Sequence, residues 1–170
     1  MSVDSMLIRE PHRYLIYAKE ALPLFLKACG IKDRYGGYLS GLDHNKQVVF
    51  TARVGRVTMN KEPKYRAFSV EKCWRTLDNE QQTSYGSREP EQDRYGGAVR
   101  LAVGALGFSG FEELDDEAFS LLLGVMTEDL SLEAARFMAA KENLSFQKLL
   151  QMEGSRMALW NIIHECRGSE

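Results

Sequence analysis

Residues 95–123 read YGGAVRLAVGALGFSGFEELDDEAFSLLL, and this stretch decides the fold. A glycine pair opens an apolar run that predicts one strand, or two strands with a tight turn near Val103-Gly104. Acidic residues 115–117 then favour a helix start, because the helix dipole stabilises negative charge at that end. Apolar residues continue at helical spacing after them. The stretch predicts a strand and helix unit that closes an α/β domain.

Upstream, residues 14–29 repeat apolar side chains at three- and four-residue steps, which predicts an amphipathic helix. Gly30 is placed to end this helix in the left-handed conformation. Pro23 lies inside the helix and lacks a backbone donor, so we expect a kink or a break near Leu22.

Residues 35–42 and 47–54 flank a turn-forming Asp43-His44-Asn45-Lys46 and predict a β-hairpin. A second helix is expected to begin at Glu62-Pro63. Its buried stripe is predicted to comprise Ala67, Val70, Cys73, Trp74 and Leu77. Its basic residues are predicted to form a solvated face, and they are Lys64, Arg66, Lys72 and Arg75.

The polar segment 79–94 reads as a loop, and from Ser131 onward the chain reads as wholly helical, with Ser131 and Ser145 as N-caps. We therefore expect an α/β domain over residues 1–126 and a helical extension over 127–170. This extension is rich in large apolar side chains, which are Phe137, Met138, Phe146, Met152, Met157 and Trp160. Exposed surface of that kind usually marks an interface, so a homo-oligomer, most simply a dimer, is predicted.

Composition excludes several classes of protein. The 170 residues carry a net charge of −2, so no overall field favours nucleic acid or an anionic membrane. No apolar run has the length of a membrane span. The first residues lack a basic region followed by a long apolar one, so no secretory signal is expected and a cytoplasmic location is predicted. The three cysteines, Cys29, Cys73 and Cys166, are expected to be reduced thiols in the core.

Motifs that would specify a reaction are missing from the sequence. GALGFSG, residues 104–110, is neither a dinucleotide fingerprint nor a phosphate-binding P-loop, and Ser109 misses the nucleophile-elbow spacing by one residue. His12, His44 and His164 stand alone, so no metal site is predicted. The acidic cluster 112–117 is interpreted as helix capping and solvation. No catalytic residue is assigned, and an enzyme is the least favoured class.

A short repeat links two parts of the chain. Residues 33–37 read DRYGG and residues 93–97 read DRYGG again, each before a predicted strand. One interpretation is a shared way of starting a strand, in which the glycines allow close backbone approach. The other is that both glycine pairs line one ligand site.

The order of elements over residues 12–126 resembles the GlcG/HbpS-type family, which includes heme-binding-protein-like and PduO C-terminal-like domains. The residues that carry the resemblance are Leu42-Asp43, Arg53, Ala67 to Leu77, Gly96-Gly97, Gly104-Ala105, Gly107, Ser109-Gly110 and Asp116-Glu117. The resemblance implies an α/β fold with a central antiparallel sheet flanked by helices. Profilin-like and GAF- or PAS-like domains are alternatives of similar topology.

The resemblance also implies a ligand, with heme or a related macrocycle as the possible cofactor. The expected site residues are Arg53, Gly96, Gly97, Ser109 and Gly110. In this hypothesis the glycine amides approach a planar or small anionic ligand, and Arg53 pairs with a carboxylate such as a heme propionate. Non-enzymatic small-ligand binding is therefore the first function predicted. The alternative is a ligand-free interaction or assembly subunit that acts through its helical extension.

Overall fold

The computed structural model describes residues 5–139, 143–153 and 156–167, and for residues 152–153, 156–161 and 167 it describes the backbone alone. The elements follow in the order α1 (Met6–Arg9), α2 (His12–Cys29), β1 (Gly36–Asp43), β2 (Val48–Gly55), α3 (Glu62–Asp78), η1 (Ser84–Ser87), η2 (Pro90–Gln92), β3 (Ala98–Leu101), β4 (Gly104–Ser109), α4 (Glu113–Met126), α5 (Leu132–Met138), α6 (Leu144–Leu150), β5 (Met152–Glu153), β6 (Arg156–Met157) and α7 (Ala158–Arg167).

A four-stranded sheet in the order β2-β1-β4-β3 forms the centre of the protein, and all of its neighbouring strands are antiparallel. Tyr38 on β1 lies opposite Arg53 on β2 and opposite Ser109 on β4. The predicted hairpin is therefore confirmed, and the fold class is an antiparallel sheet flanked by helices. The closing run, which the sequence left open as one strand or two, forms the two strands β3 and β4.

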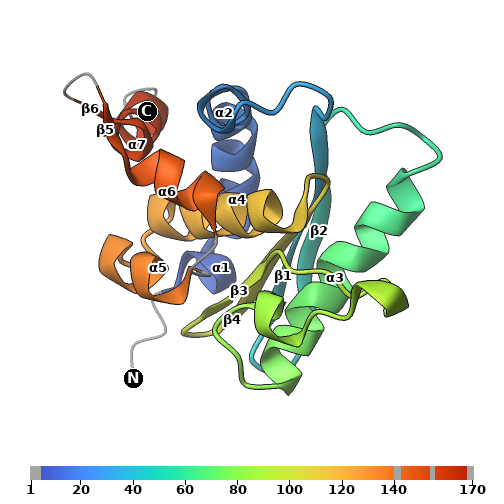
Figure 1. Cartoon of the computed structure of the whole chain (residues 1–170). Coiled ribbons are helices and arrows are strands. Elements are labelled where there is room, and N and C mark those ends of the chain that lie inside the picture. The colour runs from blue at the N-terminus through green and yellow to red at the C-terminus, as the bar shows by residue number, and fades with distance from the viewer. Residues whose placement is uncertain (1–4, 140–142, 154–155, 168–170) are drawn as a thin grey trace.

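The helices cover the sheet in layers (Figure 1). Helices α2 and α4 pack on one face of the sheet, and α3 packs on the other. Helices α6 and α7 form a further layer on the outer side of α4 and α2. In its described part, the C-terminal extension thus shares a continuous hydrophobic core with the α/β domain.

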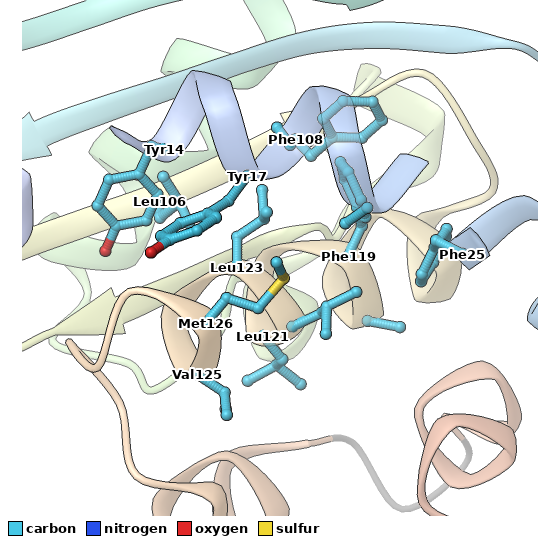
Figure 2. Close-up of a cluster of buried hydrophobic side chains, with 14 of the residues drawn as sticks. Tyr14, Tyr17, Phe25, Leu106, Phe108, Phe119, Leu121, Leu123, Val125 and Met126 are labelled. Atoms are coloured by element: carbon cyan, nitrogen blue, oxygen red, sulfur yellow. The ribbon is translucent and has the colours of Figure 1, made fainter. Parts of the chain in front are cut away.

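Aromatic rings fill the face of the sheet under α2 and α4, as Figure 2 shows for Phe25, Phe108 and Phe119. The ring centroids of Phe25 and Phe119, and those of Phe108 and Phe119, lie 4.9 Å apart. Phe111 extends the cluster and lies 4.9 Å from Phe108. Packing of this kind removes large apolar areas from water and makes this face the main source of stability.

The opposite face is built from small residues, which let α3 approach closely. A side chain at Gly107 on β4 would place its Cβ 2.7 Å from Cys73 Sγ and 2.8 Å from the carbonyl oxygen of Ser69, both on α3. Ser40 on β1 hydrogen-bonds through its hydroxyl to the hydroxyl of Ser69 at 2.7 Å. This helix is therefore held by polar contacts and close backbone packing more than by large apolar side chains.

Helix α2 runs without a break through Pro23, so the break expected near Leu22 does not occur. Gly30 ends the helix as predicted, at φ 70°, and the amide of Ile31 bonds to the carbonyl of Leu26 at 2.9 Å. Flanking contacts with the core offset the missing donor, because Leu22 and Phe25 are both buried.

The predictions for the C-terminal part are partly wrong. Ser131 caps α5 as expected, accepting a bond from the amide of Ala134, but α6 is capped by Asn143 and not by Ser145. The Ser145 hydroxyl bonds instead to Asp115. A two-stranded hairpin, β5–β6, interrupts the segment expected to be wholly helical. The side chains of Met152, Met157 and Trp160 lie outside the described part.

Segment 79–97 is held against the domain by Arg75 of α3. Its guanidinium donates to the carbonyl oxygens of Ser84 at 2.9 Å and Tyr95 at 2.5 Å. The amide of Arg100 on the edge strand β3 donates to the carbonyl of Gln82 at 2.8 Å, so this loop covers that edge of the sheet.

All three cysteines are buried and free, as expected. Burial raises the pKa of the Cys29 thiol to about 12 and that of Cys73 still further, which disfavours the reactive thiolate. Among the described helices, none combines the length and apolar character that a membrane crossing needs.

The close packing of α3 yields a prediction for Gly107. Gly107→Ala forces a methyl group against Cys73 and the backbone of α3, and we expect it to lower the free energy of unfolding by about 2 kcal/mol. Gly86→Ala is the matched control, because its Cβ meets only the flexible end of Gln81, at 3.2 Å. Urea unfolding of both variants measures the difference, and equal stabilities would contradict the packing described here.

Candidate functional site

The face that α3 turns toward the protein differs from the predicted stripe. Cys73 is buried as expected, but Trp74 is 48% exposed and Ala67 is exposed as well. Lys72 and Arg75, predicted to be solvated, are 2% and 7% exposed. The sheet face beneath α3 is small and polar, so polar residues of the helix can pack against it. Trp74 lies outside this contact, and the Lys46 ammonium lies over its ring, 4.5 Å from the ring centroid.

Lys72 reaches a cleft of about 470 Å³ that lies between α3, segment 90–95 and the β4–α4 connection. We call it the aromatic cleft. It is lined by Arg34, Lys64, Tyr65, Phe68, Lys72, Pro90, Tyr95, Ser109, Phe111, Glu112, Glu113 and Asp116. Its volume falls within the range of small-molecule sites.

A buried ion pair lies at the floor of this cleft. The Lys72 ammonium donates to Asp116 Oδ2 at 2.7 Å and to the carbonyl of Phe108 at 3.1 Å. Asp116 Oδ1 accepts from the amides of Gly110 at 3.1 Å and Phe111 at 2.8 Å. Both side chains are at most 3% exposed, so the pair ties α3, β4 and α4 together at one point.

Burial raises the pKa of Asp116 to about 6, and the Lys72 ammonium and the two amides oppose this rise. The interpretation of the acidic cluster as capping and solvation is therefore wrong for Asp116, and also for Glu117, which is fully buried. Asn143 Nδ2 donates to Glu117 Oε1 at 2.9 Å, which joins α4 to the start of α6.

Three half-buried aromatic side chains form the walls of the cleft. Tyr65 and Phe68 come from α3, and Tyr95 comes from the end of segment 79–97. The ring centroids of Phe68 and Tyr95 lie 5.8 Å apart, and the buried Phe111 closes the inner end. Half-buried aromatic rings around a hollow of this size suit a flat apolar ligand.

Ion pairs surround the mouth of the aromatic cleft. Arg34 pairs with Glu112, Arg88 pairs with Glu113 at 3.3 Å, and Lys64 lies 3.5 Å from Asp93. The three cations that line the cleft, Arg34, Lys64 and Lys72, are matched by three carboxylates, Glu112, Glu113 and Asp116. The aromatic cleft therefore carries no excess charge.

A second cleft of about 590 Å³ adjoins the first, and the two share Arg34 and Tyr65. We call it the basic cleft. It is lined by Asp33, Arg34, Tyr35, Gly36, Arg56, Val57, Thr58, Lys61, Tyr65 and Gly110. Its cations outnumber its one carboxylate, in contrast to the aromatic cleft.

The structure brings some of the predicted site residues to these clefts and leaves others apart. Ser109 lines the aromatic cleft and Gly110 lines the basic cleft. Gly97 lies behind the floor, where a Cβ would come within 2.7 Å of Asp116 and 2.8 Å of Lys72 Nζ. The amide of Gly96 bonds to Glu113 at 3.3 Å.

Arg53 lies elsewhere. It is exposed on the edge strand β2, and its guanidinium donates to Glu62 at 2.8 Å. Neither cleft includes it among its lining residues. Its pairing with a ligand carboxylate stays a prediction from the sequence.

The DRYGG repeat fits the first of its two interpretations, a shared way of starting a strand, and the two glycine pairs do not line one cleft, because Gly37, Gly96 and Gly97 line neither. Each copy leads into a strand, since the first precedes β1 and the second precedes β3. Residues 33–36 of the first copy line the basic cleft, and Tyr95 of the second copy lines the aromatic cleft. The tight start of β1 needs glycine, because a Cβ at Gly36 would lie 2.2 Å from the carbonyl oxygen of Val54.

Tyr65, Phe68 and Lys72 were not predicted as site residues, although the sequence holds a signal for them. They are spaced by three and four residues, so they share one face of α3. Their importance depends on partners far along the chain, such as Asp116, and helical spacing alone cannot identify those partners.

None of the three histidines lines either cleft. His44 lies in the exposed turn just after Asp43, the far end of β1, which is about 23 Å along the strand from Gly36. Within the described residues, no group of three or more potential metal ligands comes together.

Comparison with known proteins finds likeness among solved structures. No protein-family model matches the sequence, and no curated protein matches it significantly. The chain is similar to the crystal structure of a PduOC–heme complex, with 12% identity, a TM-score of 0.46, and coverage of 68% of this chain and 92% of that one. It is also similar to Klebsiella pneumoniae protein ORFY, of family DUF336, with 16% identity, a TM-score of 0.46, and coverage of 72% and 89%. At these identities and TM-scores the likeness says nothing about the function of this chain.

The buried pair leads to a prediction about stability. Lys72→Met leaves Asp116 without its ammonium partner, and we expect a loss of about 3–5 kcal/mol in the free energy of unfolding. Asp116→Asn keeps an oxygen for the amides of Gly110 and Phe111. The double variant should therefore be more stable than the sum of the two single losses predicts. Guanidinium unfolding of the three variants measures the coupling, and strictly additive losses would show that the pair is not coupled.

Proposed function

We propose that this protein is a non-enzymatic small-ligand binding protein that holds a flat ligand in the aromatic cleft. The observation that carries the proposal is the set of half-buried rings, Tyr65, Phe68 and Tyr95, around a hollow of about 470 Å³. Ordinary packing would bury such rings or spread them singly over the surface, whereas here they converge on one space. A flat ligand would stack on them and gain the burial that they lack.

Rigid elements support the cleft, as a binding site requires. The Lys72–Asp116 pair fixes the floor, and Arg75 fixes segment 84–95, which carries the Tyr95 wall. A pre-formed site loses little entropy when its ligand binds, which favours affinity.

Heme or a related macrocycle is the ligand that the sequence resemblance suggests, and the lining residues fit it. Bound heme would supply an iron centre, and tyrosine oxygen is one of the ligands that heme iron accepts. Tyr65 and Tyr95 offer hydroxyl groups at the cleft, and the rings of Phe68 and Phe111 offer apolar contact. The Tyr95 hydroxyl is already engaged with Asp93, at 3.3 Å, so Tyr65 is the better candidate to hold the iron.

The test is a titration of the purified protein with hemin, followed by the Soret band. We expect saturable binding at micromolar hemin, and about tenfold weaker binding for Phe68→Ala, because a stacking surface is lost. Tyr65→Phe should change the spectrum of the bound form more than its affinity. Trp74→Ala is the matched control, since it removes an exposed ring of the same helix outside the cleft.

Iron-free protoporphyrin IX separates stacking from iron ligation in the same assay. Binding of both compounds that is insensitive to Phe68→Ala would place the ligand elsewhere. No saturable change with either compound would reject the porphyrin form of the proposal.

The second candidate function is that of an interaction or assembly subunit. Two large apolar side chains at the outer layer favour it, because Phe137 is 85% exposed and Leu144 is 64% exposed. A second copy of the chain is the simplest partner, which agrees with the dimer predicted from the sequence. This second candidate assumes that the chain divides into a domain over residues 1–126 and an extension over residues 127–170 that makes the contact.

Light scattering at tens of micromolar tests the assembly function. We expect a dimer for the natural chain and a monomer for Phe137→Glu combined with Leu144→Glu, because charge at an apolar contact opposes association. Ile16→Glu, at another exposed apolar position, serves as the control and should leave the dimer intact. A monomer for the natural chain would remove this candidate.

A further inference from the structure

The basic cleft carries uncompensated positive charge beside the aromatic cleft. Of its three cations, Arg34 is already paired with Glu112. Arg56 and Lys61 make no ion pair with any residue in the described part of the chain. Asp33 is the single carboxylate of the lining. An anion in this space would therefore meet two cations whose charge no protein group neutralises.

Arg56 is held in position over this space. Its amide donates to the carbonyl of Tyr35 at 3.1 Å, and its guanidinium lies over the Tyr35 ring, 5.3 Å from the centroid. The left-handed conformation of Gly55, at φ 74°, turns the chain from β2 into this contact. A cation stacked on an aromatic face keeps its outer N–H groups available for a carboxylate or a phosphate.

Lys61 reaches the same cleft from the turn before α3. Its amide donates to the carbonyl of Thr58 at 2.8 Å, which closes the turn, and Thr58 itself lines the cleft. The opposite side is formed by bare backbone at Gly36 and Gly110, where a Cβ on Gly110 would lie 2.4 Å from the carbonyl oxygen of Gly36. A residue with a side chain is therefore not accommodated at either position, and this wall of the cleft is backbone.

We infer that the basic cleft is the subsite for the acidic groups of the ligand whose ring system occupies the aromatic cleft, with Arg56 and Lys61 as the residues that bind them. The inference rests on the proposed function. It defines the ligand class as a flat ring system that carries carboxylate or phosphate groups along one edge. Arg34 and Tyr65, which line both clefts, stand where the ring meets its acidic edge.

This assignment gives Arg56 and Lys61 the role that the sequence predicted for Arg53. Arg53 lines neither cleft and is engaged with Glu62. The two arginines lie three residues apart on the same segment, so they form a matched pair for an experiment. One arginine lines the basic cleft without a carboxylate partner, and the other lies outside it with one.

The experiment compares protoporphyrin IX, which carries two carboxylates, with its neutral dimethyl ester, by fluorescence titration of the full chain. We expect the natural protein to bind the acid about tenfold more tightly than the ester. Arg56→Gln combined with Lys61→Gln should abolish this preference by weakening binding of the acid alone. Arg53→Gln, the control, should leave both affinities unchanged, and Phe68→Ala should weaken both.

The outcomes separate this inference from the function on which it rests. Equal binding of acid and ester by the natural protein would overturn the acidic-edge subsite and leave the aromatic site standing. A preference for the acid that is lost in Arg53→Gln, and kept in the Arg56→Gln and Lys61→Gln variant, would place the acidic groups outside the basic cleft. Binding of neither compound would overturn the aromatic site and this inference together.

Discussion

One buried ion pair, Lys72 with Asp116, holds together the parts of the structure that define the site. Lys72 belongs to α3 on one face of the sheet, and Asp116 belongs to α4 on the other. They meet at the end of β4, where the Lys72 ammonium also bonds to the carbonyl of Phe108. Because an unpaired charge in this place would be costly, neither helix can shift without the other. The pair is thus a constraint on geometry as well as a contact.

The space around that pair explains why glycine occurs where it does. Gly97 adopts φ 129°, and a Cβ there would strike both Asp116 and Lys72. Gly107 has a different effect, since the lack of a side chain there lets α3 pack directly on β4. The glycines of the closing stretch therefore allow close packing first. Gly110 also lines the basic cleft, where it leaves backbone in place of a side chain, whereas Gly96, Gly97, Gly104 and Gly107 line neither cleft.

The two faces of the sheet have different roles, since one provides most of the hydrophobic core and the other borders the clefts. The face under α2 and α4 is filled with large apolar side chains and contributes most of the hydrophobic stability. The face under α3 is small and polar, so α3 can bury Ser69 and Lys72 and still present aromatic rings at its margin. Stability on one side thereby permits a partly open and polar site on the other.

The sequence by itself determined the antiparallel sheet, its first hairpin, the end of α2 and the starts of α3 and α5, because periodicity, glycine and capping act within a few residues. Residues 35–54 and 97–109 form the expected strands, and Gly30 ends the expected helix. Only the tertiary structure decided which face of α3 is buried, since Lys72 is neutralised by a carboxylate 44 residues away. The clefts also depend on tertiary structure, because each is formed by segments that are distant in the chain. No local sequence pattern indicates which of these segments come together.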